Sequence, residues 1–132
     1  MLHLHGFGMS GAYLVPTAER LAAEFHTYVP DLPGFGRSGN TLRPFDVTDL
    51  AHAAAEFLDD RSVDTATLVG NSMGCAVITE FAHLYPERLE RAVLVAPAGG
   101  CTTSRCTAPC ASWSATARGS LRGWSPSRCR TT

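Results

Sequence analysis

The 132-residue chain contains no lysine, no long apolar run and, after residue 100, no acidic residue. A membrane-spanning helix needs about 18 consecutive apolar residues, so we expect no such helix and no membrane partner. The first basic residue is Arg20. The charged start of a secretory signal peptide is therefore missing, and we expect a cytoplasmic protein. No repeat period supports collagen, a coiled coil or helical repeats.

Cysteine pairs that could build a disulfide framework or a metal site are also scarce. The chain has five cysteines, an odd number, and four of them follow residue 100. Cys106 and Cys110 have a spacing close to a zinc half-site, but no histidine and no second close pair accompany them. We therefore expect neither a disulfide scaffold nor a metal site.

Charge divides the chain into two compositions. Residues 1–100 hold six arginines and all twelve acidic residues, whereas residues 101–132 hold five arginines, six serines, six threonines and four cysteines. The second segment has too few apolar residues to offset the entropy of ordering. We expect a partial domain over residues 1–100 and an irregular tail over residues 101–132. The tail resembles GC-rich coding sequence read in the wrong frame. A nucleic-acid-binding tail is the weaker alternative because the arginines are scattered.

Short β-like runs alternate with amphipathic helical runs up to residue 96. Strands are expected at residues 2–5, 27–29, 65–69 and 92–96. The last two are apolar enough to be buried on both faces. Pro16 lies near the start of the first expected helix, Asp46 is the N-cap of the second, and Pro86 ends the third. This order predicts an α/β fold with a mostly parallel sheet of about four strands and flanking helices on both faces.

The pattern G-x-S-x-G is present as Gly70-Asn71-Ser72-Met73-Gly74. It lies between an expected strand and an expected helix, as a nucleophile elbow requires. Such a turn strains the serine backbone and exposes Oγ at the helix N-terminus, where negative charge is favoured. Gly70 and Gly74 leave room for the strand and helix to approach. We predict that Ser72 is a catalytic nucleophile. The alternative is an ordinary N-cap serine between packing glycines.

A second loop, His5-Gly6-Phe7-Gly8, follows the first expected strand. We expect the backbone N–H of Phe7 to point at the same oxyanion as the N–H of Met73. Gly6 and Gly8 shape this loop. His5 is expected to organise the loop by hydrogen bonding, because the geometry needed to reach the serine is not implied.

A third loop, at residues 31–38, is rich in proline and glycine and follows the second expected strand. We expect it to support the oxyanion loop, with Asp31 bonded to its backbone.

With these three motifs in order, residues 2–99 resemble the α/β-hydrolase family. The elbow is most similar to those of carbon–carbon bond hydrolases of aromatic-ring degradation and related esterases. The resemblance implies an eight-stranded, mostly parallel sheet, a Ser–His–acid triad and no metal or organic cofactor. It matches Ser72 to the nucleophile and Phe7 and Met73 to the oxyanion donors.

The triad of this family runs serine, acid, histidine along the chain. No aspartate follows Ser72, and the only later acids are Glu80, Glu87 and Glu90. The only later histidine is His83, expected on the surface of the elbow helix. The resemblance also implies two strands before the one at residues 2–5, and we expect them to be absent. The sequence thus predicts a partial hydrolase core.

The function expected from the sequence is that of a serine hydrolase acting on ester or carbon–carbon bonds of small molecules. Its activity is expected to be impaired because the triad acid and histidine are missing. The alternative is a non-catalytic fragment or binding remnant of a hydrolase. A small-molecule substrate is the expected partner, and no nucleic acid, membrane, metal or cofactor is expected. The identity of the substrate and the oligomeric state do not follow from the sequence.

Overall fold

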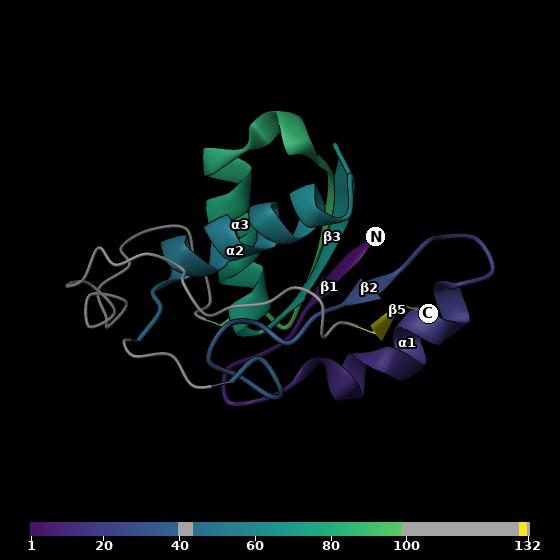
Figure 1. The fold of residues 1–132 in the computed structure, drawn as a ribbon, viewed down its shortest axis with the longest axis horizontal. Coiled ribbons are helices and arrows are strands. Elements are labelled where there is room, and N and C mark those ends of the chain that lie inside the picture. The colour runs from purple at the N-terminus through teal and green to yellow at the C-terminus, as the bar shows by residue number, and fades with distance from the viewer. Residues whose placement is uncertain (40–43, 99–129, 132) are drawn as a thin grey trace.

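The computed structural model describes residues 1–39, 44–98 and 130–131 (Figure 1). Strands and helices alternate along most of the chain. Its elements are β1 (Leu2–Leu4), η1 (Gly11–Leu14), α1 (Val15–Leu21), β2 (Tyr28–Val29), α2 (Val47–Asp60), β3 (Ala66–Asn71), α3 (Met73–Leu84), η2 (Pro86–Arg88), β4 (Leu89–Val95) and β5 (Arg130–Thr131).

These strands form one sheet in the order β4-β3-β1-β2-β5. Leu2 is in parallel register with Tyr28 on one side and with Leu68 on the other. β4 is parallel to β3, with Ala92 opposite Leu68. The predicted parallel sheet of about four strands is therefore confirmed. β5 adds a short antiparallel strand beside β2.

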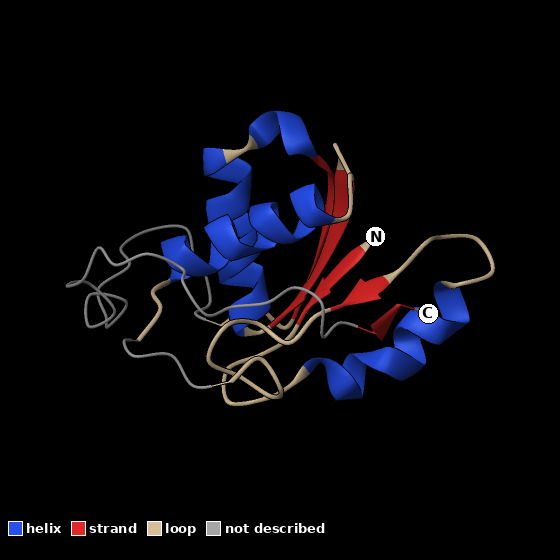
Figure 2. Ribbon diagram, in the orientation of Figure 1, coloured by secondary structure: helices blue, strands red, loops and turns tan. Residues whose placement is uncertain are grey.

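Helices flank this sheet on both sides, as predicted. Figure 2 shows the sheet between α2 and α3 on one side and α1 on the other. Leu2 and Leu4, two residues apart on β1, share one face because strand side chains alternate. They join Phe57 of α2 and Phe81 of α3 in the main hydrophobic core. The core thus ties the central strand β1 to α2 and α3.

Local sequence signals define the helix ends. Pro16 lies in the first turn of α1, and α3 ends just before Pro86. Asp46 caps α2: its Oδ1 accepts the Asp49 N–H at 2.8 Å, and Asp49 Oδ2 accepts the Asp46 N–H at 3.1 Å. This reciprocal pair is a capping box, with an aspartate where glutamate is more usual.

The expectation that both late strands are buried on both faces is wrong. β3 alternates buried and half-buried residues. β4 is exposed beyond Leu89, and Val93, Leu94 and Val95 are each 46–48% exposed. In the part of the chain that the structure describes, β4 is the last strand on its side of the sheet. An apolar run indicates a strand, but it does not tell where the sheet ends.

The irregular tail predicted for residues 101–132 lies mostly outside the described residues. Arg130 and Thr131 are described, and they form β5 rather than irregular chain. Among the described helices, none is both long and apolar enough to cross a membrane.

Candidate active site

Ser72 occupies the turn between β3 and α3, where the nucleophile elbow was predicted. Its backbone has φ 52° and ψ −110°, a conformation that residues with a Cβ rarely adopt. Its N–H donates to the Val95 carbonyl at 3.0 Å, which anchors the turn to the end of β4. Ser72 stands at the N-cap position of α3, yet in the described structure its side chain makes no capping hydrogen bond. The hydroxyl is therefore not used as an ordinary helix cap.

Gly70 and Gly74 stand where a side chain would not fit. A Cβ on Gly70 would lie 2.6 Å from the carbonyl carbon of Gly74, and a Cβ on Gly74 would overlap the Leu4 carbonyl. All of these neighbours are backbone atoms, which cannot swing aside. The two glycines thus allow β3, α3 and β1 to meet closely around Ser72.

The loop after β1 lies against this turn. A Cβ on Gly6 would be 3.3 Å from the Ser72 Cβ, so the two backbones are close. Phe7 follows directly, with its side chain 62% exposed and its ring edge-on to Phe35 at a centroid distance of 5.8 Å. Gly8 has φ +71° and no neighbouring atom within 4 Å of its missing Cβ. The structure therefore brings the segments carrying Phe7 and Met73 together at Ser72.

His5 is fully buried, and both of its ring nitrogens are bonded to backbone. Nε2 accepts the Leu32 N–H at 2.9 Å, so the ring proton is on Nδ1 and is donated to the Gly6 carbonyl at 2.8 Å. Burial lowers the pKa of His5, partly opposed by the Gly6 bond and the Asp31 charge. The imidazole is neutral, and each of its two nitrogens makes a hydrogen bond. It therefore joins two loops and has no nitrogen left to take a proton from Ser72.

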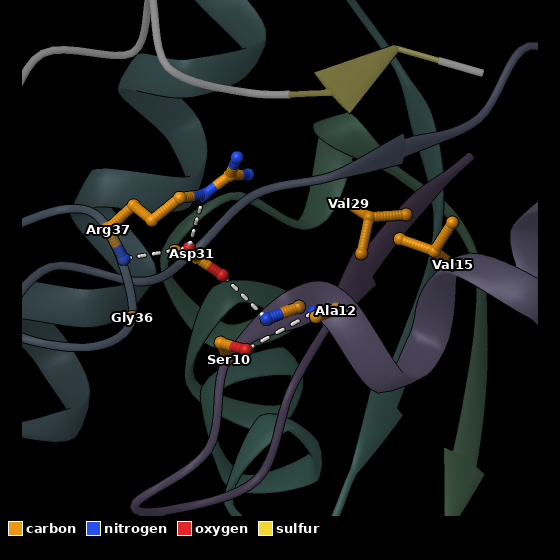
Figure 3. A pocket seen from close by; sticks show the side chains of 8 residues that line it. Ser10, Ala12, Val15, Val29, Asp31, Gly36 and Arg37 are labelled. Carbon is orange, nitrogen blue, oxygen red and sulfur yellow. Dashed lines mark hydrogen bonds and ion pairs between the residues drawn. The ribbon is translucent and has the colours of Figure 1, made fainter.

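Asp31 anchors the loop of residues 31–38. Oδ1 accepts the Gly11 N–H at 2.6 Å, and Oδ2 accepts the Arg37 N–H at 2.9 Å and pairs with Arg37 Nε at 3.5 Å (Figure 3). Burial alone would raise the pKa of this carboxyl, but the two amides and the Arg37 guanidinium outweigh it and hold the pKa below its ordinary value. A Cβ on Gly36, which has φ +53°, would collide with the carboxylate. Asp31 thus supports the loop from inside.

A cavity of about 350 Å³ lies behind this loop. Figure 3 shows the side chains around it, which come from η1, α1, β2 and the loop. The lining residues are Ser10, Gly11, Ala12, Val15, Val29, Asp31, Gly36 and Arg37. Ser72, Phe7 and Met73 are not among them, so the cavity is separate from the elbow.

Tyr13 and Asn71 belong to the elbow region, although no role was predicted for either. The Gly6 N–H donates to the Tyr13 hydroxyl oxygen at 2.9 Å, and that hydroxyl donates to Asn71 Oδ1 at 3.0 Å. Asn71 occupies a variable position of the motif. Tyr13 reaches the site only because η1 turns back toward the end of β1, which no sequence period reveals.

None of the histidines in the described structure is hydrogen-bonded to Ser72. His83 is exposed in the last turn of α3, eleven residues after Ser72, or roughly 16 Å along the helix. His52 is bonded to the Tyr85 hydroxyl at 2.5 Å. Glu80 accepts a hydrogen bond from Thr48 at 3.0 Å. Within the described ranges, no three His, Cys, Asp or Glu side chains gather to hold a metal ion.

Residues 1–125 match the family model described as alpha/beta hydrolase fold. The chain belongs to the α/β-hydrolase family. Among relatives of this hydrolase chain, a pimeloyl-[acyl-carrier protein] methyl ester esterase of Vibrio parahaemolyticus is 40% identical over 93 residues. A poly(3-hydroxyalkanoate) depolymerase of Ectopseudomonas oleovorans is 33% identical over 100 residues. The structure of a thermophilic esterase from Thermogutta terrifontis is similar with a TM-score of 0.68 and 32% identity.

These matches cover most of the hydrolase chain but a minor part of each relative. The three alignments span 70%, 76% and 70% of this chain and 34%, 35% and 35% of the respective relatives. The hydrolase chain therefore spans about a third of the length of the relatives it matches.

Proposed function

We propose that Ser72 is the nucleophile of a serine-hydrolase site acting on ester or carbon–carbon bonds of small molecules. The observation that carries the proposal is the positive φ of Ser72 at a strand-to-helix turn closed by two sterically required glycines. Such a backbone conformation costs free energy, and residues that adopt it cluster at functional sites. The esterase named among the relatives supports ester bonds in particular.

The mechanism begins with attack of Ser72 Oγ on a carbonyl carbon. The carbonyl oxygen becomes an oxyanion, which the backbone N–H groups of Phe7 and Met73 would stabilise as hydrogen-bond donors. The N-terminal end of α3 adds a favourable dipole there. The arrangement of Gly6 against Ser72 supports this assignment because it places the Phe7 peptide beside the elbow.

The proton of the Ser72 hydroxyl needs an acceptor, and the described residues offer no histidine in hydrogen-bond contact. A serine without its base is a weak nucleophile at neutral pH. We therefore expect this chain alone to hydrolyse esters slowly. The same observation favours the alternative, a non-catalytic fragment or binding remnant of a hydrolase, which would keep the fold but not the reactivity of Ser72.

Covalent labelling by a fluorophosphonate separates the two functions. We expect mass spectrometry to map the adduct to Ser72 in the folded protein and to find none there in Ser72→Ala. Ser62→Ala is the matched control, since Ser62 also has a positive φ, 55°, but lies outside the elbow. Labelling of Ser72 no faster than in urea-unfolded protein would favour the non-catalytic fragment.

A further inference from the structure

The hydroxyl of Tyr13 lies at the junction of the three segments that form the elbow region. A Cβ on Gly6 would meet the Ser72 Cβ at 3.3 Å, Asn71 Oδ1 at 3.4 Å and the Tyr13 hydroxyl at 3.6 Å. These three groups come from α3's N-cap, the end of β3 and η1. The loop after β1 is thus held between the tyrosine and the nucleophile turn.

The Tyr13 hydroxyl acts here both as a hydrogen-bond acceptor and as a hydrogen-bond donor. It accepts the Gly6 N–H at 2.9 Å and donates to Asn71 Oδ1 at 3.0 Å. The Gly6 amide is therefore committed to Tyr13, and the amide of Phe7, which follows it in the loop, is the one that the proposed function assigns to the oxyanion. A phenylalanine ring would fill the same space but would make neither bond.

We propose that Tyr13 is a positioning residue for the Ser72 site. Its hydroxyl fixes the Gly6–Phe7 peptide on one side and Asn71, the residue before the nucleophile, on the other. The bridge thereby limits the movement of the Phe7 N–H relative to the turn that carries Ser72. This inference rests on the proposed function of Ser72.

A structural role alone would look different from this positioning role. The Tyr13 side chain is 39% exposed, so replacing its hydroxyl sacrifices little packing. Misplacing reacting groups by about 1 Å can cost up to about 100-fold in rate even when the fold is intact. Tyr13→Phe should therefore change the reactivity of Ser72 far more than it changes stability.

The test is fluorophosphonate labelling of Ser72 in the 132-residue chain, resolved into an inactivation rate and an inhibition constant. We expect Tyr13→Phe to lower the inactivation rate about tenfold, with the inhibition constant and the urea midpoint little changed. Asn71→Ala should slow it similarly, and the double variant should be no slower, because both remove one network.

Tyr85→Phe is the matched control, since it also removes a hydrogen-bonded tyrosine hydroxyl, at the opposite end of α3. It should label at the wild-type rate. Equal rates in Tyr13→Phe and wild type, or equal losses in Tyr13→Phe and Tyr85→Phe, would overturn the positioning role.

A readout independent of labelling keeps this inference separate from the proposed function. If wild-type Ser72 is not labelled, the proposed function fails, and amide hydrogen exchange at Gly6 then decides the role of Tyr13. Exchange at Gly6 that is at least tenfold faster in Tyr13→Phe than in Tyr85→Phe supports the bridge. Unchanged exchange overturns it.

Discussion

Ser72 is half-buried and has a backbone conformation that its Cβ disfavours. Strain of this kind costs about 1–3 kcal/mol and must be offset by the surrounding structure. Here the constraints are the close contact of Gly70 with Gly74 and the bond from the Ser72 N–H to Val95. The residue that we propose as nucleophile is thus also a place where the fold stores free energy.

Ser72→Gly should therefore increase the free energy of unfolding while removing the hydroxyl. We expect it to be about 1 kcal/mol more stable than Ser72→Ala, because glycine adopts positive φ without penalty and alanine does not. Urea denaturation of both variants measures the difference. Equal stabilities would show that the turn is not strained.

His3 gives the structure a pH dependence that does not involve the elbow. It is fully buried on β1, and among the described residues neither ring nitrogen has a hydrogen-bond partner. Burial, with a smaller effect of the positive N-terminus, lowers the pKa of His3 below its ordinary value. The unfolded chain, with a pKa of about 6.5, then binds more protons than the folded chain at mildly acidic pH.

Stability should accordingly be full above about pH 6.5 and should be lost as the pH falls toward the lowered pKa of the folded state. His3→Leu should reduce this loss and raise stability at pH 7 by about 1 kcal/mol, because it removes an unpaired buried polar group. Urea midpoints from pH 5 to pH 8 test this. The same substitution at the exposed His83 should reproduce the wild-type profile. If the urea midpoint of His3→Leu fell with pH as steeply as that of wild type, His3 would not be the source of the pH dependence.

At the scale of elements, the contact of α3 with β1 depends on the absence of one side chain. Gly74→Ala places a methyl group on the Leu4 carbonyl, and we expect a loss of about 3 kcal/mol, at the upper end for an overpacked interior. Gly8→Ala is the comparison, since Gly8 has open space and only its positive φ to oppose alanine. Its cost should be about 1 kcal/mol. If thermal unfolding showed similar losses of stability in Gly74→Ala and Gly8→Ala, the close contact of Gly74 with Leu4 would not determine the cost.

The elements that the sequence predicted are those with local causes. Asp46 and Pro86 define the helix ends through capping and through the missing N–H of proline, which depend only on neighbouring residues. The strand-to-helix turn was predictable partly for the same reason, since Gly70 is required by its contact with Gly74 four residues later, whereas the contact of Gly74 with Leu4 is not local. The burial of β4 and the contribution of Tyr13 depend on which segments become neighbours in space. No local pattern carries that information.

At the scale of the whole molecule, the described residues form a sheet that is covered unevenly. Leu2 and Leu4 on β1 are fully buried, whereas Val93, Leu94 and Val95 on β4 are about half exposed. The Asp31 loop is nevertheless bonded to the segment after β1, through Asp31 to the Gly11 N–H and through the Leu32 N–H to His5. The chain therefore keeps the parallel sheet and flanking helices of a partial α/β-hydrolase fold while it spans about a third of the relatives' length.

We propose that this chain carries a nucleophile elbow at Ser72 and that none of the described residues serves it as a base. The direct measurement is p-nitrophenyl acetate hydrolysis with and without added imidazole, in wild type, Ser72→Ala and His83→Ala. Imidazole can accept the proton for which the described part of the chain offers no histidine in contact with Ser72. We predict slow turnover alone, an imidazole-dependent increment in wild type and His83→Ala, and no increment beyond free imidazole in Ser72→Ala. Robust turnover without imidazole that is lost in both variants would contradict the account, because His83 would then be the base.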